Sequence, residues 1–225
     1  MKTITVSIII RTHNNRDTVR KAVESALNQV VESLNVEVVL IDDASRDESF
    51  EEIADYLDQV SYIKTNGLGA VAALNLGIVR ATGQYFTILD ADDFLPSNAV
   101  RSLINPFLKE ENIAAVYGDY YEIAVGSKSK KLKKTSQNIF NTVAGGILFK
   151  KKLVASSGLY DTSLFFPEYD LLIKLERKYK LVHVNKVVYN YVRSGQSLTA
   201  SAQKVIEGVK QLEKKYGKKL PIREY

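Results

Sequence analysis

The first half of the chain alternates short, almost wholly apolar runs with segments of helical periodicity, and this alternation most restricts its fold. The apolar runs are residues 6–10, 36–41 and 85–89. Such runs are typical of central strands in a parallel sheet, which helices cover on both faces. The pattern therefore predicts an α/β protein with a doubly wound, mostly parallel sheet, whose ligands bind beyond the carboxyl ends of the strands.

The segments between these runs are predicted to be helices. We expect Asn14 or Asn15 to cap the first of them, because a side-chain oxygen there can accept hydrogen bonds from the first turn. Gly83 is expected to supply the left-handed residue that ends a later helix. Another helix is predicted near residues 100–108, and Pro106 should kink or shorten it.

The pattern changes after residue 112. Strands are predicted at residues 115–125, 147–149 and 181–191, with a helix before the last strand and another near the C-terminus. The basic residues 126–134 lie where a hairpin tip is expected. No linker separates the halves, so the second half is predicted to form a smaller lid on the first.

Composition excludes several classes of protein. The chain has 225 residues, no cysteine and a formal net charge of +5, so disulfides, thiolate metal sites and cysteine nucleophiles are excluded. The charge mildly favours anionic partners. No apolar run approaches the roughly 18 to 20 residues that span a bilayer, and the N-terminus lacks a signal-type core. We expect a cytoplasmic protein that is at most peripheral at the inner face of the membrane.

Acidic residues follow two of the predicted strands. Asp42 and Asp43 end one strand, and Asp90, Asp92 and Asp93 end another. Parallel strands share one carboxyl edge, so the two clusters are expected to face each other across a crevice. Carboxylates without neighbouring Cys or His suit Mg²⁺ or Mn²⁺. The alternative is that these aspartates form turns and cap helices, although their mutual repulsion favours a cation among them.

Six stretches occur in the order of a known family: residues 6–14, 26–29, 37–45, 66–69, 73–77 and 83–93. Each is weak alone, but the ordered set resembles the family 2 inverting glycosyltransferases of the GT-A fold. The resemblance implies a single GT-A-like domain over residues 1–225, with a nucleotide-sugar-binding half at 1–112 and an acceptor-binding half at 113–225. A smaller C-terminal, acceptor-side lid belongs to that expectation.

The implied reaction moves a sugar from a nucleoside-diphosphate sugar, with UDP favoured, to a hydroxyl acceptor, and it inverts the anomeric carbon. The acceptor would be a carbohydrate or a lipid-linked molecule, in the synthesis of cell-surface polysaccharide, glycolipid or glycoprotein glycan. Nucleic acid is not expected as a partner.

The resemblance also assigns roles at the donor site. The residues assigned to the nucleotide are Thr12, His13, Asn14, Asp43, Asn66, Gly69 and Asp90. Asp43 would accept a hydrogen bond from the base. Asp92 would be the direct ligand of Mg²⁺ or Mn²⁺, with Asp90 beside it. The family usually has proline where Arg11 stands and often tyrosine where His13 stands.

A catalytic base is implied in the second half. Residues 166–175 resemble the family stretch in which the second carboxylate of an acidic pair deprotonates the acceptor. Glu168 aligns with that base, while Pro167 replaces the preceding acid. Asp170 is the other candidate. Glu168 is favoured because Asp170 has Lys174 one helical turn away as a partner, although an acid near a helix N-terminus needs no catalytic role.

Two basic features have two interpretations each. Residues 191–199 resemble a family loop over the diphosphate, in which Arg193 would neutralise the leaving group, but the family histidine is missing. A surface arginine is the alternative. The run Lys128–Lys134 is either a solvated hairpin tip or a peripheral contact with anionic lipid or a polyprenyl-phosphate acceptor.

Two other functions stay open. The altered acidic pair is compatible with a non-catalytic sugar-nucleotide-binding module. A nucleotidyltransferase on a related sheet would need a glycine- and basic-rich triphosphate loop, which residues 11–15 lack. A dinucleotide-binding Rossmann protein is disfavoured because no G-x-G-x-x-G follows the first strand.

Overall fold

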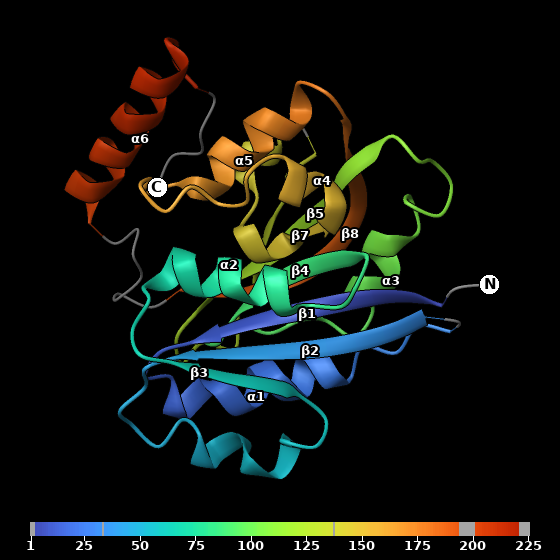
Figure 1. The fold of residues 1–225 in the computed structure, drawn as a ribbon, viewed down its shortest axis with the longest axis vertical. Helices are drawn as coiled ribbons and strands as arrows, with labels where there is room; N and C mark the ends of the chain where they lie inside the picture. Colours follow the sequence, from blue (N-terminus) through green and yellow to red (C-terminus); the bar gives the residue numbers. More distant parts are fainter. Residues whose placement is uncertain (1–2, 33, 137, 194–200, 221–225) are drawn as a thin grey trace.

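A computed structural model describes residues 3–32, 34–136, 138–193 and 201–220. Within these ranges one eight-stranded sheet, in the order β3-β2-β1-β4-β7-β5-β6 with β8 beside β5, carries helices on both faces (Figure 1). The strands are β1 Ile4–Thr12, β2 Leu34–Asp43, β3 Ser61–Thr65, β4 Tyr85–Asp90, β5 Ile113–Ala124, β6 Lys131–Lys133, β7 Ile147–Lys150 and β8 Lys180–Arg193. The α-helices are α1 Arg16–Leu27, α2 Ala70–Arg80, α3 Ala99–Ile104, α4 Lys151–Ser156, α5 Pro167–Glu176 and α6 Ala202–Tyr216. The 3₁₀ helices are η1 Glu51–Tyr56, η2 Ile139–Asn141 and η3 Ala144–Gly146.

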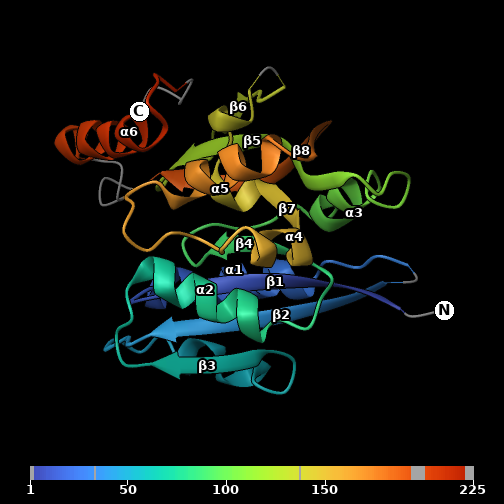
Figure 2. The ribbon, with the colours of Figure 1, turned by 45° about the horizontal axis from the view of Figure 1, so that its top comes forward.

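The first four strands form the predicted parallel part of the sheet. β1 lies between β2 and β4 and is parallel to both, and β3 extends the sheet beyond β2. The interior of β1 is fully buried, as its apolar run predicts, because α1 and α2 cover opposite faces (Figure 2). The carboxyl ends of β1, β2 and β4 consequently lie at one edge, here called the carboxyl edge.

The second half continues this sheet. β7 pairs antiparallel with β4 and β5, and β8 runs parallel to β5. The second half is thus joined to the first through one sheet, because its strands find partners on the open side of β4. Helices α4 and α5 of this half lie over the sheet, with α6 outside α5 (Figure 1).

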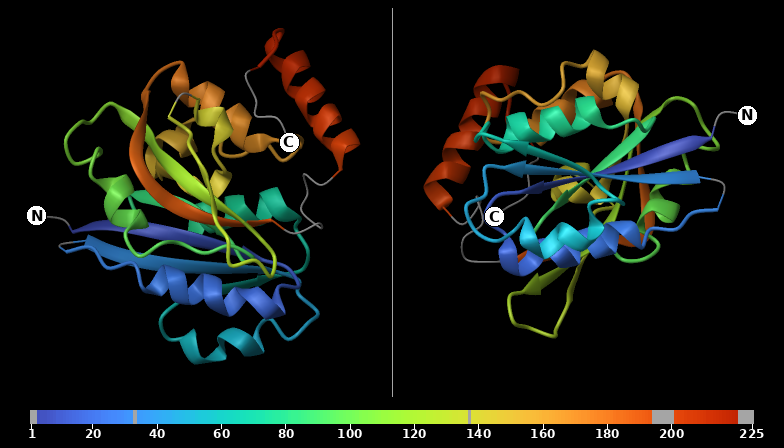
Figure 3. Two further views of the ribbon diagram at one scale, coloured as in Figure 1. Left: turned by 180° about the vertical axis from the view of Figure 1, so that it is seen from behind. Right: turned by 60° about the horizontal axis from the view of Figure 1, so that its bottom comes forward.

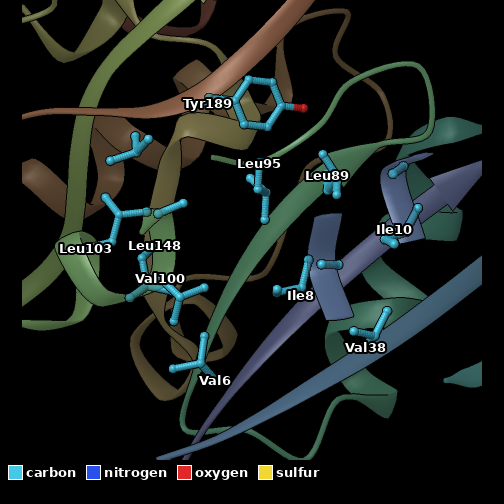
Figure 4. Close-up of a cluster of buried hydrophobic side chains, with 14 of the residues drawn as sticks. Val6, Ile8, Ile10, Val38, Leu89, Leu95, Val100, Leu103, Leu148 and Tyr189 are labelled. Carbon is cyan, nitrogen blue, oxygen red and sulfur yellow. The ribbon is translucent and has the colours of Figure 1, made fainter. Parts of the chain in front are cut away.

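Two apolar layers hold the sheet to its helices. On the α1 side the core includes Ile8, Ile10 and Leu89, with Tyr189 of β8 beside them (Figure 4). On the α2 and α5 side it includes Ile9 and the other buried apolar residues that lie between the sheet and these two helices. Alternate residues of β1 thus enter different layers, as strand geometry requires.

Two local expectations about caps and turns need correction. Asn15 stands at the N-cap of α1, but its carboxamide oxygen accepts the His13 N–H and does not cap the helix. Gly83 does not have the expected left-handed backbone. A Cβ at Gly83 would lie 2.5 Å from Ser7 Oγ and 2.8 Å from the Thr5 carbonyl oxygen, so close packing against β1 requires the glycine.

Two further predictions concern the helix before β3 and the helix after β4, and the first of them changes in helix type. The segment around Ile53 is a 3₁₀ helix where an α-helix was expected. α3 ends at Ile104, two residues before Pro106, as that proline predicts.

Within the described ranges, no helix combines the length and the apolar character needed to cross a membrane.

Candidate functional site

The carboxyl edge brings together residues that are far apart in the sequence. Thr12 of β1 lies opposite Asp42 of β2, and Arg11 lies opposite Asp90 of β4. The sheet register thus places the two predicted acidic segments on either side of one strand. Ligands of open α/β sheets bind at such an edge.

The loop that follows β1 is tied to the loop that follows β2. The His13 ring nitrogen Nδ1 lies 2.6 Å from the carbonyl oxygen of Asp43. Asn14 has a left-handed backbone, with φ 55°. Its N–H donates to Ser45 Oγ at 2.9 Å, and its side-chain oxygen accepts the Arg46 N–H at 2.8 Å. His13 and Asn14 are both exposed, so this pair of loops offers a fixed polar rim to a ligand.

Asp43 organises the segment on the other side of this rim. Its carboxylate accepts hydrogen bonds from Thr65 Oγ1 at 2.5 Å, the Leu68 N–H at 2.6 Å and the Gly69 N–H at 2.8 Å. Burial opposes ionisation, but these hydrogen bonds lower the pKa of Asp43. A carboxylate has about four acceptor positions, so about one is left for a ligand. Asn66, in the same loop, is exposed.

Asp90 and Asp92 form the acidic part of the edge. Asp90 Oδ1 accepts a hydrogen bond from Arg11 Nη2 at 2.7 Å, and the two side chains are 34% and 23% exposed. The Asp92 carboxylate has no ion pair with another residue in the described part of the chain. Burial, and then the charge of Asp90, raise the pKa of Asp92. Asp92 is thus a half-buried carboxylate that a cation would stabilise.

Asp93 differs from both of its neighbours. It is 3% exposed and accepts hydrogen bonds from the Tyr189 hydroxyl at 2.8 Å and the Val192 N–H at 2.7 Å. Burial, followed by the charges of Asp90 and Asp92, raises its pKa well above the usual range. Asp93 therefore ties the acidic turn to β8 and is not open to a ligand.

The two acidic segments do not merge into one pocket. Asp42 accepts hydrogen bonds from the Tyr62 hydroxyl and the Ser45 N–H, and Asp43 is engaged as described above. Among the described residues, no three acidic, histidine or cysteine side chains are grouped as in an all-protein metal site. The two acidic segments are therefore engaged separately: hydrogen bonds hold Asp42 and Asp43, and Arg11 pairs with Asp90 alone.

The residues present nevertheless fit a hard divalent cation of the expected kind. Mg²⁺ and Mn²⁺ favour oxygen ligands, and such ions are often held by one or two carboxylates while substrate phosphates supply the rest. Asp92 offers an uncompensated carboxylate, and Asp90 offers its second oxygen.

Asp170, one of the two base candidates, is completely buried. It receives Lys174 Nζ and Lys215 Nζ, each at 2.7 Å, and the Tyr216 hydroxyl at 2.6 Å. Burial opposes ionisation, but hydrogen bonds from these three groups lower its pKa. Asp170 thus fastens α6 to α5, and its side chain does not reach solvent where an acceptor hydroxyl would bind.

Glu168, the other candidate, lies half-buried in the first turn of α5. Tyr160 is buried nearby, and burial, followed by the charges of Glu168 and Asp90, raises the pKa of its hydroxyl. The Tyr160 backbone is clamped by the Asn75 carboxamide, with hydrogen bonds of 2.8 and 3.1 Å. The negative charges of Glu168 and Asp90 are thus both felt at the Tyr160 hydroxyl, although the two residues are far apart in the sequence.

Arg193 ends β8 and is largely exposed. Its nearest acidic partner is Glu122, at 4.0 Å. The rest of the loop that resembles the family segment, residues 194–199, lies outside the described residues. The role of Arg193 at a diphosphate stays a prediction.

The basic run Lys128–Lys134 forms a hairpin, as predicted. β6 pairs antiparallel with β5, and the hairpin projects from the sheet (Figure 3). Lys130 Nζ lies 5.8 Å from the centroid of Phe94, which directly follows the acidic turn, and Lys21 Nζ lies 3.4 Å from the same ring. Burial, and then Lys130, lower the pKa of Lys21. Two ammonium groups thus converge beside the carboxyl edge.

Three features of the site were not assigned a role from the sequence. Arg11 was noted only as a departure from the family, and its ion pair with Asp90 depends on the β1–β4 register. The Tyr189 hydroxyl donates to Asp93 and accepts the Asp90 N–H, yet Tyr189 lies about a hundred residues further along the chain. Ala44 has φ 64°, a strained conformation that is common at functional sites. The sequence did offer a signal for Arg11, because a charged residue there follows an otherwise apolar run.

Comparisons with known proteins agree with this arrangement. A glycosyltransferase from Haemophilus influenzae is 32% identical over 150 residues, which are 64% of this chain and 59% of that protein. The poly(ribitol-phosphate) β-N-acetylglucosaminyltransferase TarP of Staphylococcus aureus is 29% identical over 188 residues, which are 82% of this chain and 52% of TarP. This chain therefore spans somewhat more than half the length of these relatives.

Solved structures share the fold. A Pyrobaculum calidifontis mannosyltransferase in complex with GDP-Man and Mn²⁺ matches with a TM-score of 0.74 and 16% identity, over 97% of this chain and 65% of that one. Residues 1–349 of S. aureus TarS in complex with UDP-GlcNAc match with a TM-score of 0.69 and 15% identity, over 88% and 61%. The predicted GT-A-type sheet flanked by helices is confirmed.

The family model "Glycosyl transferase family 2" matches residues 7–159. The match contains both acidic segments of the carboxyl edge and ends before Glu168. Because it covers more than half of the chain, the predicted family is confirmed: this protein belongs to glycosyltransferase family 2.

Proposed function

We propose that this protein transfers a sugar from a nucleoside-diphosphate sugar, with UDP favoured, to a hydroxyl group of a carbohydrate or lipid-linked acceptor, and inverts the anomeric carbon. The observation that carries the proposal is the state of Asp92. It lies half-buried beside Asp90 with no protein cation paired to it among the described residues, at the edge where open α/β sheets bind their ligands.

The donor would bind along the carboxyl edge. The nucleoside would lie against residues 12–14, and the remaining acceptor position of Asp43 would take an N–H of the base. The ionised state of Asp43 suits this role, because a charged acceptor makes a stronger hydrogen bond. Asn66 and Gly69 would border the same part of the ligand.

A divalent cation, Mg²⁺ or Mn²⁺, would be held by Asp92 with Asp90 beside it, and when bound it would neutralise charge on the departing diphosphate. The family relationship and the Mn²⁺ in the Pyrobaculum structure support this assignment. Arg193 would add a further positive charge near the diphosphate.

Glu168 is the proposed base. Its carboxylate would take the proton of the acceptor hydroxyl while that oxygen bonds to the anomeric carbon, and the bond from this carbon to the diphosphate oxygen would break with its electron pair. Attack opposite the leaving group inverts the configuration. The complete burial of Asp170 under two lysines and a tyrosine supports Glu168 over Asp170 in this role.

The acceptor is proposed to be anionic. Lys21 and Lys130 converge on Phe94 next to the acidic turn, and the hairpin adds exposed lysines. TarP acts on poly(ribitol-phosphate), a polymer of this charge.

Replacing Lys130 and Lys131 with glutamine should raise the KM for such an acceptor severalfold, most strongly at low salt. Replacing Lys109 and Lys152, at the opposite edge, removes equal charge as a control. A loss of vesicle binding without a change in KM would assign the hairpin to the membrane instead.

A thermal-shift panel tests donor binding. UDP-, GDP- and dTDP-sugars are each added with and without Mn²⁺, and a bound donor should raise the unfolding temperature in a metal-dependent way. Release of the free sugar or formation of product then separates an enzyme from a non-catalytic binding module. No stabilisation by any donor would contradict the proposal, and release of pyrophosphate from a nucleoside triphosphate would favour a nucleotidyltransferase.

A further inference from the structure

The sheet register fixes Arg11 against Asp90. The two residues are direct partners in the parallel β1–β4 ladder. Each lies two positions after a residue buried in the layer on the α2 side, Ile9 in β1 and Ile88 in β4, so both side chains leave the same face of the sheet. Arg11 Nη2 and Asp90 Oδ1 are 2.7 Å apart. The register thus brings the two residues side by side, and the Arg11 guanidinium completes the contact with Asp90.

The charges around this pair are unbalanced. Asp90, Asp92 and Asp93 supply three carboxyl groups within one turn, and Arg11 is the cation that the described residues place in ion-pair contact with them. Its effect reaches Asp92 as well, because the Arg11 charge acts to lower the Asp92 pKa against burial and Asp90. Arg11 therefore already occupies part of the space and charge that a divalent cation would take.

We propose that Arg11 is a resident counter-cation that engages Asp90 in the nucleotide-free protein, so that a divalent cation binds tightly only together with a nucleoside diphosphate. This inference rests on the proposed function. Arg11 takes one oxygen of Asp90 and repels a second cation nearby, which leaves Asp92 as the main free ligand. A bound diphosphate removes both the repulsion and the shortage of ligands. Its negative charge offsets that of Arg11, and its oxygens complete the coordination of the divalent cation.

The first measurement needs no catalysis. Mn²⁺ binding to the nucleotide-free protein is followed by the electron paramagnetic resonance signal of unbound Mn²⁺. Arg11→Met should bind Mn²⁺ at least about tenfold more tightly than the wild type, since a nearby positive charge is removed and Asp90 is released. With saturating nucleoside diphosphate present, the difference between the two proteins should shrink. An unchanged Mn²⁺ affinity in Arg11→Met without nucleotide overturns the inference.

A double-mutant cycle assigns the effect to Asp90. Asp90→Asn alone should change nucleotide-free Mn²⁺ affinity little, because Arg11 already engages that carboxylate. In the Arg11→Met background the same substitution should remove most of the gained affinity, which gives a coupling between the two sites. Additive effects of the two substitutions would overturn the role given to the ion pair.

Controls separate this effect from loss of an arginine in general. Arg20→Met breaks the ion pairs of Arg20 in α1 with Glu24 and with Asp55 of η1, both at 3.2 Å, and should leave Mn²⁺ affinity unchanged. Circular dichroism and thermal unfolding check each variant. If the Arg11→Met variant does not fold, Arg11→Gln takes its place, and Mn²⁺ should bind to it more tightly by the same factor.

The results distinguish this inference from the proposed function. If nucleotides bind and sugar is transferred but Arg11→Met leaves Mn²⁺ affinity unchanged, the inference alone fails. If Arg11→Met tightens Mn²⁺ binding but no nucleotide or donor sugar binds to the wild type, the proposed function fails while the role of the ion pair stands.

Discussion

Two acidic clusters of this protein differ in how their charge is balanced. Around α5 and α6, Asp161 and Asp170 are matched by Lys174 and Lys215, and the pKa values of both aspartates are lowered. At the carboxyl edge, Asp90, Asp92 and Asp93 share Arg11 alone among the described residues. There the pKa values of Asp92 and Asp93 are raised, mainly by burial.

The acids around α5 and α6 thus support the fold, whereas we propose that those at the carboxyl edge bind a ligand. The cluster around α5 and α6 is balanced without any ligand, so its energy supports the fold. The carboxyl edge keeps unfavourable charge in the free protein, and raised carboxylate pKa values of this kind cluster at functional sites. The following substitutions test this difference, from the largest expected effect to the smallest.

Asp92→Asn should lower the transfer rate by at least about a hundredfold, because the proposed cation contributes several kcal/mol to the transition state. Thermal unfolding should change little, since the Asp92 carboxylate is unfavourable in the free fold. Initial rates at saturating donor and Mn²⁺ measure the effect, and Asp55→Asn on the surface is the control. Full activity in Asp92→Asn would remove Asp92 from the site.

Glu168→Gln should lower kcat about a hundredfold, since general-base catalysis typically contributes this much. The KM for the donor should stay the same, because glutamine retains the size of the side chain and Glu168 is proposed to act on the acceptor. Glu176→Gln, at the exposed other end of α5, is the matched control. A kcat that falls in Glu176→Gln but not in Glu168→Gln would be incompatible with the proposed base.

Asp170→Asn should cost about 2 kcal/mol of unfolding free energy, because a fully buried carboxylate loses its charge-assisted hydrogen bonds. This loss of unfolding free energy is moderate because Lys174 and Lys215 are each about one-third exposed, so water can solvate their ammonium groups in the variant. Transfer at low temperature should be largely retained. Urea unfolding measures the cost, and Asp58→Asn on the surface is the comparison. A strong loss of kcat at unchanged stability would return Asp170 to the list of base candidates.

The contribution of Asp170 to the unfolding free energy depends on pH in a defined direction. The pKa of Asp170 is lowered on folding, so its stabilising contribution is present above the unfolded value of about 3.9 and disappears as the pH falls through the lower folded value. The stability difference between wild type and Asp170→Asn should stay constant from about pH 5 to 8 and shrink below about pH 4. A difference that grows on acidification would contradict the ion-pair assignment.

Tyr189→Phe should have the smallest effect, about 1 kcal/mol of stability, since it removes the hydroxyl that bonds the Asp90 N–H and Asp93. The transfer rate should fall severalfold because the acidic turn loses a support. Denaturant unfolding and initial rates measure both effects, and Tyr179→Phe is the control. An equal loss in the control would show that the effect is unspecific.

The sequence by itself determined the parallel half of the sheet and which edge carries the candidate site. Apolar runs such as residues 6–10 can be buried on both faces only in a central strand, and the aspartates that follow them must then meet at one edge. Apolar runs and helical periodicity are local properties of the sequence, so the prediction of the parallel strands held. The ordered stretches also indicated the family, which the comparisons confirm.

Only the tertiary structure decided how each charged group is balanced. Asp170 and Glu168 stand two residues apart on one helix, yet Asp170 is buried because Lys215 and Tyr216 of α6 reach it. Arg11 meets Asp90 through the register of two strands separated by about seventy residues. Gly83 is required by contact with β1 and not by a turn. Charge balance and close packing depend on partners distant in the sequence, and for this reason local patterns do not reveal them.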